Sequence, residues 1–290
     1  MKQADSCQRF LFSGLDIRGE VVRLGESYTE VLANKDYPGP VRNLLGEFLT
    51  ASVLLSTTVK FDGRLVLQAR SQGEIPLIMA ECTSEQQLRG IARYSDDPVS
   101  DEFADLLRAG TLAITIEPHQ GESYQGIVPL AQHTLAACLE EYFLRSEQLE
   151  SRFFLASDGV TCAGLLLQQL PAQLLKDEEL RHEEWSTVSQ LAATLTSNEL
   201  LSLTNEETLY RLFHQHRIKL FDQKPVVYQC SCSRERTARA LHAIGEEEVM
   251  SIIAEQGAVE ITCEFCGKQY RFLEGELGLL FESPVDGKAH

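Results

Sequence analysis

The chain has 290 residues, 43% of them hydrophobic, which is enough apolar material for about two packed domains and excludes a disordered or fibrous protein. Lysine and arginine number 26 against 43 acidic residues, and the formal net charge of −17 disfavours a specific nucleic-acid partner. The amino terminus lacks the pattern of a secretory signal, and no run of about 18 apolar residues occurs. We therefore expect a cytoplasmic protein without a membrane segment.

The first part of the chain, residues 1–175, predicts an α/β core domain. Two apolar runs within residues 10–24, on either side of Asp16, Arg18 and Gly19, are typical of a hairpin. Two prolines, Pro38 and Pro40, precede a three-four periodicity that predicts an amphipathic helix lying on the sheet. That helix is expected over residues 41–56.

Short β-rich runs follow and are separated by glycine, proline and aspartate; they lie at residues 64–70, 75–82, 88–94, 111–117 and 124–128. Their short connections favour antiparallel pairing. A second amphipathic helix is expected at 130–146, and residues 152–170 return to strand before a closing helical turn. The fold class is therefore α+β, with a mostly antiparallel sheet.

A change of composition after Pro171 places a boundary near residue 175, and residues 176–229 are predicted to form a helical linker with little strand character. Thr204 and Glu207 have the spacing of a capping box. Two narrow apolar stripes run along the predicted helices: Trp185, Val188, Leu191 and Leu195 form one, and Leu209, Leu212 and Phe213 form the other. Stripes this narrow bury little area per ordered residue, so permanent packing and detachable docking both stay open.

The eight cysteines fall into two groups. Four occur singly among apolar or small residues and predict buried, inert thiols: Cys7, Cys82, Cys138 and Cys162. The other four form two close pairs, Cys230-Ser231-Cys232 and Cys263-Glu264-Phe265-Cys266. Two ligands in each of two local turns is a common way to build a tetrahedral zinc site, and a 61-residue tail over 230–290 needs such a staple.

The paired cysteines thus predict one structural Zn(II) per chain, because four thiolates close the coordination sphere and leave no catalytic position. Gly267 follows the last cysteine, where a knuckle favours positive φ. Strands are expected at 259–261 and 270–272, and two short helices on either side of Gly245. Four buried core thiols or a thioredoxin-like dithiol explain the paired spacing less well.

Other motifs favour no ordinary enzyme. The sequence contains no nucleotide-binding loop, nucleophile elbow or zinc-protease motif. A basic cluster formed by Arg234, Arg236, Arg239, Lys268 and Arg271 would suit a nucleic-acid-binding zinc ribbon. However, residues 230–290 hold 6 basic and 11 acidic residues, so a solvated charged face is favoured.

A Cys-X-Cys pair followed about thirty residues later by Cys-X-X-Cys-Gly, behind YPGPVRNLLGEFLTA at 37–51 and YQGIVPL at 124–130, resembles the heat-shock protein 33 family of redox-regulated chaperones. The resemblance covers the whole chain and matches the family's zinc ligands to Cys230, Cys232, Cys263 and Cys266. It implies a cytosolic stress-response holdase that is inactive when reduced and zinc-bound and active when oxidised. It also implies a metastable linker and a homodimeric active form.

Oxidation is expected to link Cys230 to Cys232 and Cys263 to Cys266, each the nearest partner along the chain, with zinc release and linker unfolding. Unfolding client proteins would then bind, without ATP, to apolar surface of the first domain and to the two linker stripes. The alternative is a zinc-ribbon adaptor that binds a folded protein or RNA. The helical middle favours the chaperone, because a simple adaptor needs no weakly held helices between two folded parts.

Overall fold

The computed structural model describes residues 4–95 and 100–276. The chain divides into two compact units, Met1–Gln229 and Cys230–His290. The mixed α+β fold expected from the sequence is confirmed.

One sheet of the first unit has the strand order β10-β1-β2-β9-β8, with β11 also paired to β1. Its strands are β1 (Ser6–Phe12), β2 (Ile17–Leu24), β8 (Ser151–Ser157), β9 (Cys162–Gln169), β10 (Ile218–Leu220) and β11 (Lys224–Pro225). The predicted hairpin is confirmed as β1 and β2, but its turn lies at residues 13–16, where Gly14 has a φ of +86°. Arg18 and Gly19 are inside β2, because this sheet continues the strand further than the sequence pattern indicated.

The second sheet has the order β12-β5-β4-β3-β6-β7, and every pairing in it is antiparallel except that of β12 with β5. Its strands are β3 (Gly63–Arg70), β4 (Leu77–Thr83), β5 (Gln87–Arg93), β6 (Thr111–Pro118), β7 (Tyr124–Pro129) and β12 (Val227–Tyr228). The short helix α3 (Phe103–Leu106) precedes β6. The strands expected before residue 130 are therefore confirmed, as is their antiparallel pairing.

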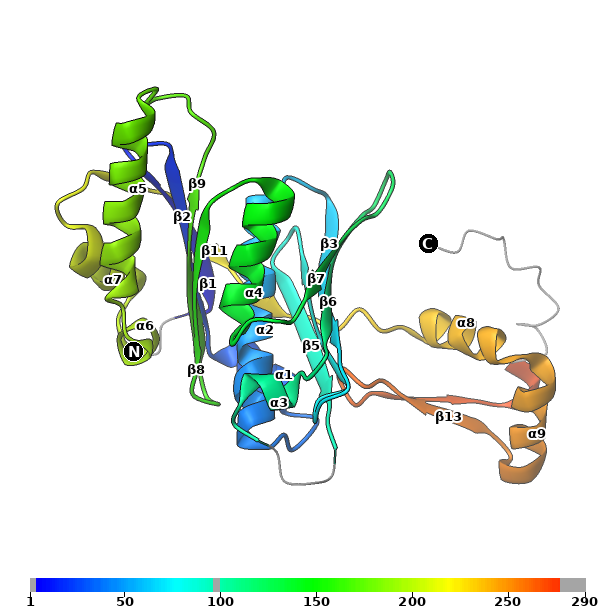
Figure 1. The fold of residues 1–290 in the computed structure, drawn as a ribbon. Coiled ribbons are helices and arrows are strands. Elements are labelled where there is room, and N and C mark those ends of the chain that lie inside the picture. Colours follow the sequence, from blue (N-terminus) through cyan, green and yellow to red (C-terminus); the bar gives the residue numbers. More distant parts are fainter. Residues whose placement is uncertain (1–3, 96–99, 277–290) are drawn as a thin grey trace. The chain divides into compact units, whose positions relative to one another are not determined.

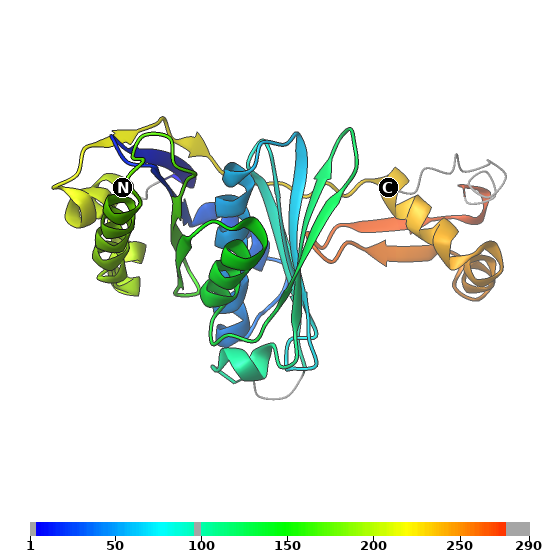
Figure 2. The same ribbon diagram turned by 45° about the horizontal axis from the view of Figure 1, so that its top comes forward.

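Helix α2 (Gly39–Thr58) lies between the two sheets (Figures 1 and 2). Thirteen of its twenty residues are buried, so the helix expected on the sheet is confirmed, but it is buried more fully than an amphipathic pattern indicates. The reason is tertiary: a helix covered by a sheet on both sides buries its serine and threonine positions too. These hydroxyls donate to backbone carbonyls within the helix, as Thr50 does to Gly46 and Ser56 to Val53.

Helices α1 (Glu26–Leu32) and α4 (Leu135–Tyr142) complete this middle layer, and α4 runs on into a π-helical turn at Phe143–Glu147. The helix expected at 130–146 thus begins later, because the Thr134 hydroxyl accepts from Ala137 N and caps it there. The closing helical turn expected before Pro171 is absent: β8 and β9 form a hairpin, and irregular backbone follows.

Helices α5 (Glu178–Ala193), α6 (Ser197–Ser202) and α7 (Asn205–Phe213) lie against the other face of the first sheet (Figures 1 and 2). The capping box at Thr204 and Glu207 is confirmed, and Thr196 with Glu199 forms a second one. The short strands β10, β11 and β12 follow α7 and were missed by the sequence analysis. Each has two or three residues and exists only because a long strand of the core offers it an edge.

The second unit contains α8 (Arg234–Ile244), α9 (Glu246–Gln256) and the antiparallel hairpin of β13 (Val259–Thr262) and β14 (Gln269–Phe272). The predicted helix pair and hairpin are confirmed, and Gly245 separates the helices with a φ of +107°. Six buried side chains form the core cluster of its described residues: Leu241, Val249, Ile253, Val259, Tyr270 and Phe272.

The double-sided burial of α2 predicts a large cost for a cavity in it. Leu54→Ala is expected to lower the free energy of unfolding of the first unit by about 2–5 kcal/mol, because the fully buried leucine contacts a core that cannot collapse into the void. Leu174→Ala is the control, since that side chain is 65% exposed and its loss should change stability by under about 0.5 kcal/mol. Urea unfolding measures both, and equal losses would contradict the sandwiched position of α2.

Candidate functional site

The second cysteine pair lies in a knuckle at the end of the β13–β14 hairpin. Cys263 N donates to Lys268 O at 2.9 Å, and Gly267 N donates to Cys263 O at 2.8 Å. Gly267 has a φ of +68°, as the sequence predicted. These bonds turn the chain sharply between Cys263 and Cys266, so both side chains leave the backbone on the same side.

The first pair, Cys230 and Cys232, lies between strand β12 and helix α8. The Ser233 hydroxyl accepts from Arg236 N and caps α8 immediately after Cys232. The Arg236 guanidinium returns to donate to the Ser231 hydroxyl at 2.7 Å and to Ser231 O at 3.2 Å. The backbone between the two cysteines is therefore fixed by the first turn of the helix that follows.

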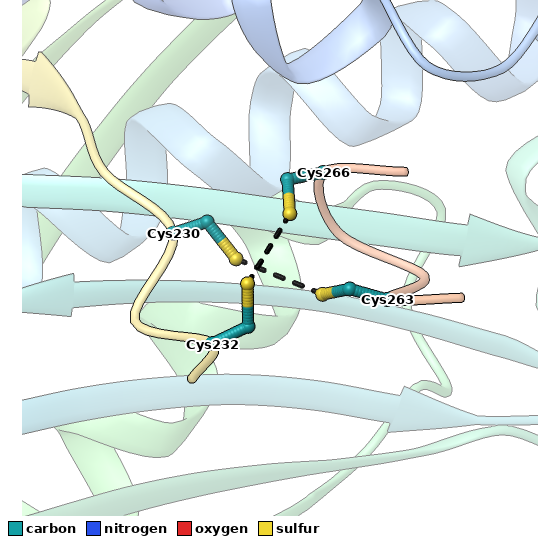
Figure 3. Close-up of side chains that lie close together, drawn as sticks. All are labelled: Cys230, Cys232, Cys263 and Cys266. Atoms are coloured by element: carbon teal, nitrogen blue, oxygen red, sulfur yellow. Dashed lines mark hydrogen bonds between the residues drawn. The ribbon is translucent and has the colours of Figure 1, made fainter. Parts of the chain in front are cut away.

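The four sulfurs converge on one point (Figure 3). All of them lie within 4.8 Å of one another, and the closest contacts join Cys230 to Cys263 at 3.7 Å and Cys232 to Cys266 at 3.4 Å. A tetrahedron of thiolates around zinc, with bonds of about 2.3 Å, has edges of about 3.8 Å. The cluster therefore has the donor set and the spacing of a four-thiolate metal site, and it could bind a metal ion.

Tyr270, on β14, is a site residue that the sequence analysis missed. Its hydroxyl donates to Cys232 Sγ at 3.1 Å, and its ring belongs to the small core of the unit. Burial opposes ionisation of Cys232, but hydrogen bonds from Tyr270 and the neighbouring cysteines lower the pKa of this thiol to about 7. No spacing rule indicates such a residue, although its position four residues beyond the knuckle places it on the strand that carries the cluster.

The other four cysteines are buried in the first unit and unpaired, as predicted. Burial raises the pKa of Cys7 and of Cys82 to about 12, and it also raises those of Cys138 and Cys162. Thiols that are buried and protonated are poor nucleophiles and poor metal ligands. Chemistry at sulfur therefore belongs to the second unit.

The two linker stripes lie on the first sheet. We call its outer face the platform; its apolar residues are Phe10, Phe12, Ile17, Val21, Ala156, Ala163, Leu165 and Leu167. All seven stripe residues are buried or partly buried in the same cluster: Trp185, Val188, Leu191, Leu195, Leu209, Leu212 and Phe213. The helices α5 to α7 therefore cover the apolar surface of this sheet.

Three polar residues beside the platform hold the backbone or side chains of the covering segment, and none was predicted. Asp16 accepts from the amides of Gln173, Leu174 and Leu175 at 3.0–3.1 Å. Burial opposes its ionisation, but these bonds hold the pKa of Asp16 below its usual range. Gln8 accepts from the Asn205 amide at 3.2 Å, and Arg23 donates to carbonyls at the end of α6.

The model of the Hsp33 protein family matches residues 5–273. The chain belongs to the Hsp33 family. It is 49% identical to the 33 kDa chaperonin of Pseudomonas paraeruginosa over 97% of this chain and 96% of that protein, and 49% identical to that of Pseudomonas fluorescens over 97% of both. The Hsp33 homolog of Thermotoga maritima has the same fold, with a TM-score of 0.81, 24% identity and coverage of 96% of this chain and 98% of that chain.

Membership in Hsp33 makes this chain a member of a chaperonin family and not an enzyme. A chaperonin has client proteins as its partners. Within residues 4–95 and 100–276, no helix is both long and apolar enough to cross a membrane.

Tyr270→Phe tests the hydrogen bond to the cluster. Removal of the hydroxyl should weaken metal binding by about tenfold, because hydrogen bonds to ligand atoms orient them and stabilise their charge. Competition with a chromogenic chelator, at equal protein concentrations, measures the affinity. The ring should still pack in the core of the second unit, so an unchanged circular dichroism spectrum of the metal-loaded protein is the control. Equal affinities would show that the bond is not made when a metal is bound.

Proposed function

We propose that this chain is a redox-regulated holdase chaperone that works without ATP, inactive while its cysteines are reduced and zinc-bound. The observation that carries the proposal is that an apolar sheet face is covered by helices from residues 176–229. An apolar face of this kind is what an unfolding protein would bind. Helices α5 to α7, which we call the cover, would block this face in the inactive state. In the active state, the platform and the two stripes would form the surface that binds clients.

Cys230, Cys232, Cys263 and Cys266 would hold one Zn(II) per chain. Bound zinc supplies a positive charge that keeps all four sulfurs as thiolates, the form that oxidants attack. The half-buried sulfurs are open to a small oxidant, unlike the four buried thiols. The described part of this unit has a core of six buried side chains, which is small for independent stability. The metal site would therefore contribute most of the unit's stability.

A peroxide is a sufficient oxidant for the switch. Two thiolates, two protons from solvent and one hydrogen peroxide give one disulfide and two waters: the sulfurs lose two electrons, and the O–O bond accepts them. Two such reactions join all four sulfurs, and a disulfide sulfur carries no thiolate charge with which to hold a metal. The 61 residues of the tail over 230–290 would unfold once the metal is lost, since metal binding supplies on the order of 10 kcal/mol to the folding free energy of small zinc modules.

The pairing within each motif, Cys230 with Cys232 and Cys263 with Cys266, joins nearest neighbours along the chain. The shortest sulfur contacts run between the motifs instead, at 3.4 and 3.7 Å. Both pairings are within reach, because all four sulfurs lie within 4.8 Å. We propose the pairing within motifs, and peptide mapping of the oxidised protein decides between the two.

The cover is suited to detachment because its contact with the platform is imperfect. Among the described residues, buried side-chain atoms without a hydrogen-bond partner gather there: Arg23 Nε, Arg181 Nε, Ser189 Oγ, Asn205 Oδ1 and His216 Nδ1. A cavity of about 320 Å³ also lies between α5 and the start of β8. Each buried polar atom without a partner costs about 1–3 kcal/mol relative to its hydrated state, which favours release.

The linker also ends beside the cysteines. Strand β12 pairs with β5, Gln229 N donates to Leu88 O at 3.0 Å, and Cys230 is the next residue. Unfolding that begins at Cys230 would therefore free the last strand of the linker first. We further propose a homodimeric active form and a cytoplasmic location, both of which rest on the resemblance to the family.

The alternative function, a zinc-ribbon adaptor for a folded protein or RNA, has less support. Arg234, in the basic cluster, pairs with Glu276 at 2.8 Å and lies 4.3 Å over the ring of Phe272. Arg236 is bound to Ser231. These cations serve the unit's own fold, and an adaptor gives the covered platform no role.

The function is tested by client protection before and after oxidation. Reduced protein should carry one zinc and leave an unfolding client to aggregate; peroxide should release the zinc, form two disulfides and suppress aggregation without ATP. Light scattering, a zinc-sensitive dye and thiol counting follow the three events in one sample. Oxidised protein that kept its zinc, or that lost it without gaining holdase activity, would overturn the proposal. A reductant with zinc should restore the inactive form.

The role of the cover is tested on α7 alone. Leu209→Ser removes a side chain that is 5% exposed and should weaken docking by about 2–4 kcal/mol, so protection should appear at a lower peroxide dose. Tyr210→Ser is the matched control, because that neighbour on the same helix is 75% exposed. The peroxide dose that gives half-maximal protection measures both. An unchanged dose for Leu209→Ser would remove α7 from the mechanism.

A further inference from the structure

Arg23, on β2, is a charged residue at the edge of the platform and only 8% exposed. Its guanidinium donates to three main-chain carbonyls of the linker segment. Its Nη1 atom donates to Leu201 O at 2.5 Å, and its Nη2 atom donates to Leu200 O at 2.8 Å and, in a shorter contact, to Leu203 O. One side chain of the sheet therefore binds the whole carboxyl end of α6.

The carbonyls are good ligands for this guanidinium because they lie at a helix carboxyl end. The last carbonyls of a helix have no partner within it, and they carry the negative end of its dipole. No carboxylate forms an ion pair with Arg23 among the residues that the structure describes, and burial lowers the pKa of its guanidinium. The three carbonyls are thus the compensation for a buried positive charge.

Arg23 lies between the buried polar residue Ser6, opposite it on β1, and the apolar platform. Val21, two residues earlier on the same strand, belongs to the platform cluster, and Leu200, whose carbonyl Arg23 binds, is 2% exposed in the same cluster. A fixed fork of donors therefore stands beside a surface that binds aliphatic and aromatic side chains. When the cover detaches, the guanidinium of Arg23 and the apolar surface beside it become exposed together.

We propose that Arg23 is a binding site for main-chain carbonyl groups, occupied by α6 in the inactive form and by a client's backbone in the active form. This inference rests on the proposed function. An unfolding protein exposes apolar side chains together with carbonyls that have lost their hydrogen bonds. Every residue has a carbonyl, so a site that binds it recognises unfolded chain without regard to sequence, while the platform selects apolar segments.

If one residue binds both α6 and the client, its substitution has two opposing effects on chaperone activity. Arg23→Met keeps the aliphatic length of the side chain and removes its donors. It should loosen α6, which makes the reduced protein easier to open, and it should also weaken the hold on a client. A residue that only stabilises the first unit would not both ease the opening of the reduced protein and weaken its affinity for a client.

The first measurement is amide hydrogen exchange in the reduced, zinc-loaded full chain. We expect exchange in α6 and α7 to be at least tenfold faster in Arg23→Met than in the wild type, with Arg23→Lys between them because one ammonium cannot reach three carbonyls as a fork does. Arg70→Met, an exposed arginine on β3, is the control and should exchange like the wild type. Unchanged exchange in Arg23→Met overturns the proposal.

The second measurement uses the oxidised full chain and a permanently unfolded probe, reduced and carboxymethylated α-lactalbumin with a fluorescent label. Fluorescence anisotropy should give a Kd about tenfold higher for Arg23→Met than for the wild type and for Arg70→Met. An equal Kd for Arg23→Met overturns the shared site. If Arg23→Met does not fold, Arg23→Gln, which keeps one amide donor without the charge, takes its place in both experiments.

The two measurements also separate this inference from the proposed function. Wild-type protein that binds no probe after oxidation overturns the holdase and, with it, the client half of the inference. The exchange experiment needs no oxidation, so it still decides whether Arg23 holds α6. Probe binding by the wild type with equal Kd values for all variants leaves the holdase intact and overturns only the role of Arg23.

Discussion

The burial of the platform is the interaction on which the rest of this structure depends. The sheet of β1, β2, β8 and β9 has two apolar faces, of which the inner one packs on α2 and the outer one on residues 176–229 (Figure 1). Phe213 is the centre of the outer contact, with its ring 5.0 Å from that of Phe12 and 6.2 Å from that of Phe10. The ring of Phe10 in turn lies over Gly19, where a β-carbon would be 2.0 Å from it. The outer face of this sheet is therefore buried by aromatic and aliphatic side chains of the covering helices.

The two faces of that sheet are satisfied to different degrees. On the inner side, the hydroxyls of α2 donate to carbonyls of their own helix, and the packing is continuous with the second sheet. On the outer side, several polar atoms have no hydrogen-bond partner among the described residues, and carbonyls compensate the charge of Arg23. Under the proposed function, the outer layer is the part that unfolds first, while the fold beneath it persists.

Under the proposed function, the cysteine cluster supplies the chemistry that releases the outer layer. The described part of the second unit has few buried side chains, and its four sulfurs lie close enough together to bind one metal ion. In a unit of this size, a change in the covalent state of sulfur is a change in folding free energy. Tyr270 belongs both to the cysteine cluster and to the core, since its hydroxyl contacts Cys232 and its ring packs among the buried side chains. Under the proposed function, the same residues would react with the oxidant and stabilise the fold.

The sequence by itself determined the cysteine cluster, the hairpin that carries it, the capping box at Thr204 and the apolar stripes of the linker. These features depend on residues within a few positions of one another, so spacing is enough to predict them. The tertiary structure alone decided that α2 is buried on both sides, that β10 to β12 are strands, and that the stripes lie on Phe10, Phe12 and their neighbours. It also decided the partners of Asp16 and Arg23, which bind segments more than 150 residues away along the chain. Contacts of that separation depend on how the sheets stack, and no local pattern of residue types records which face meets which.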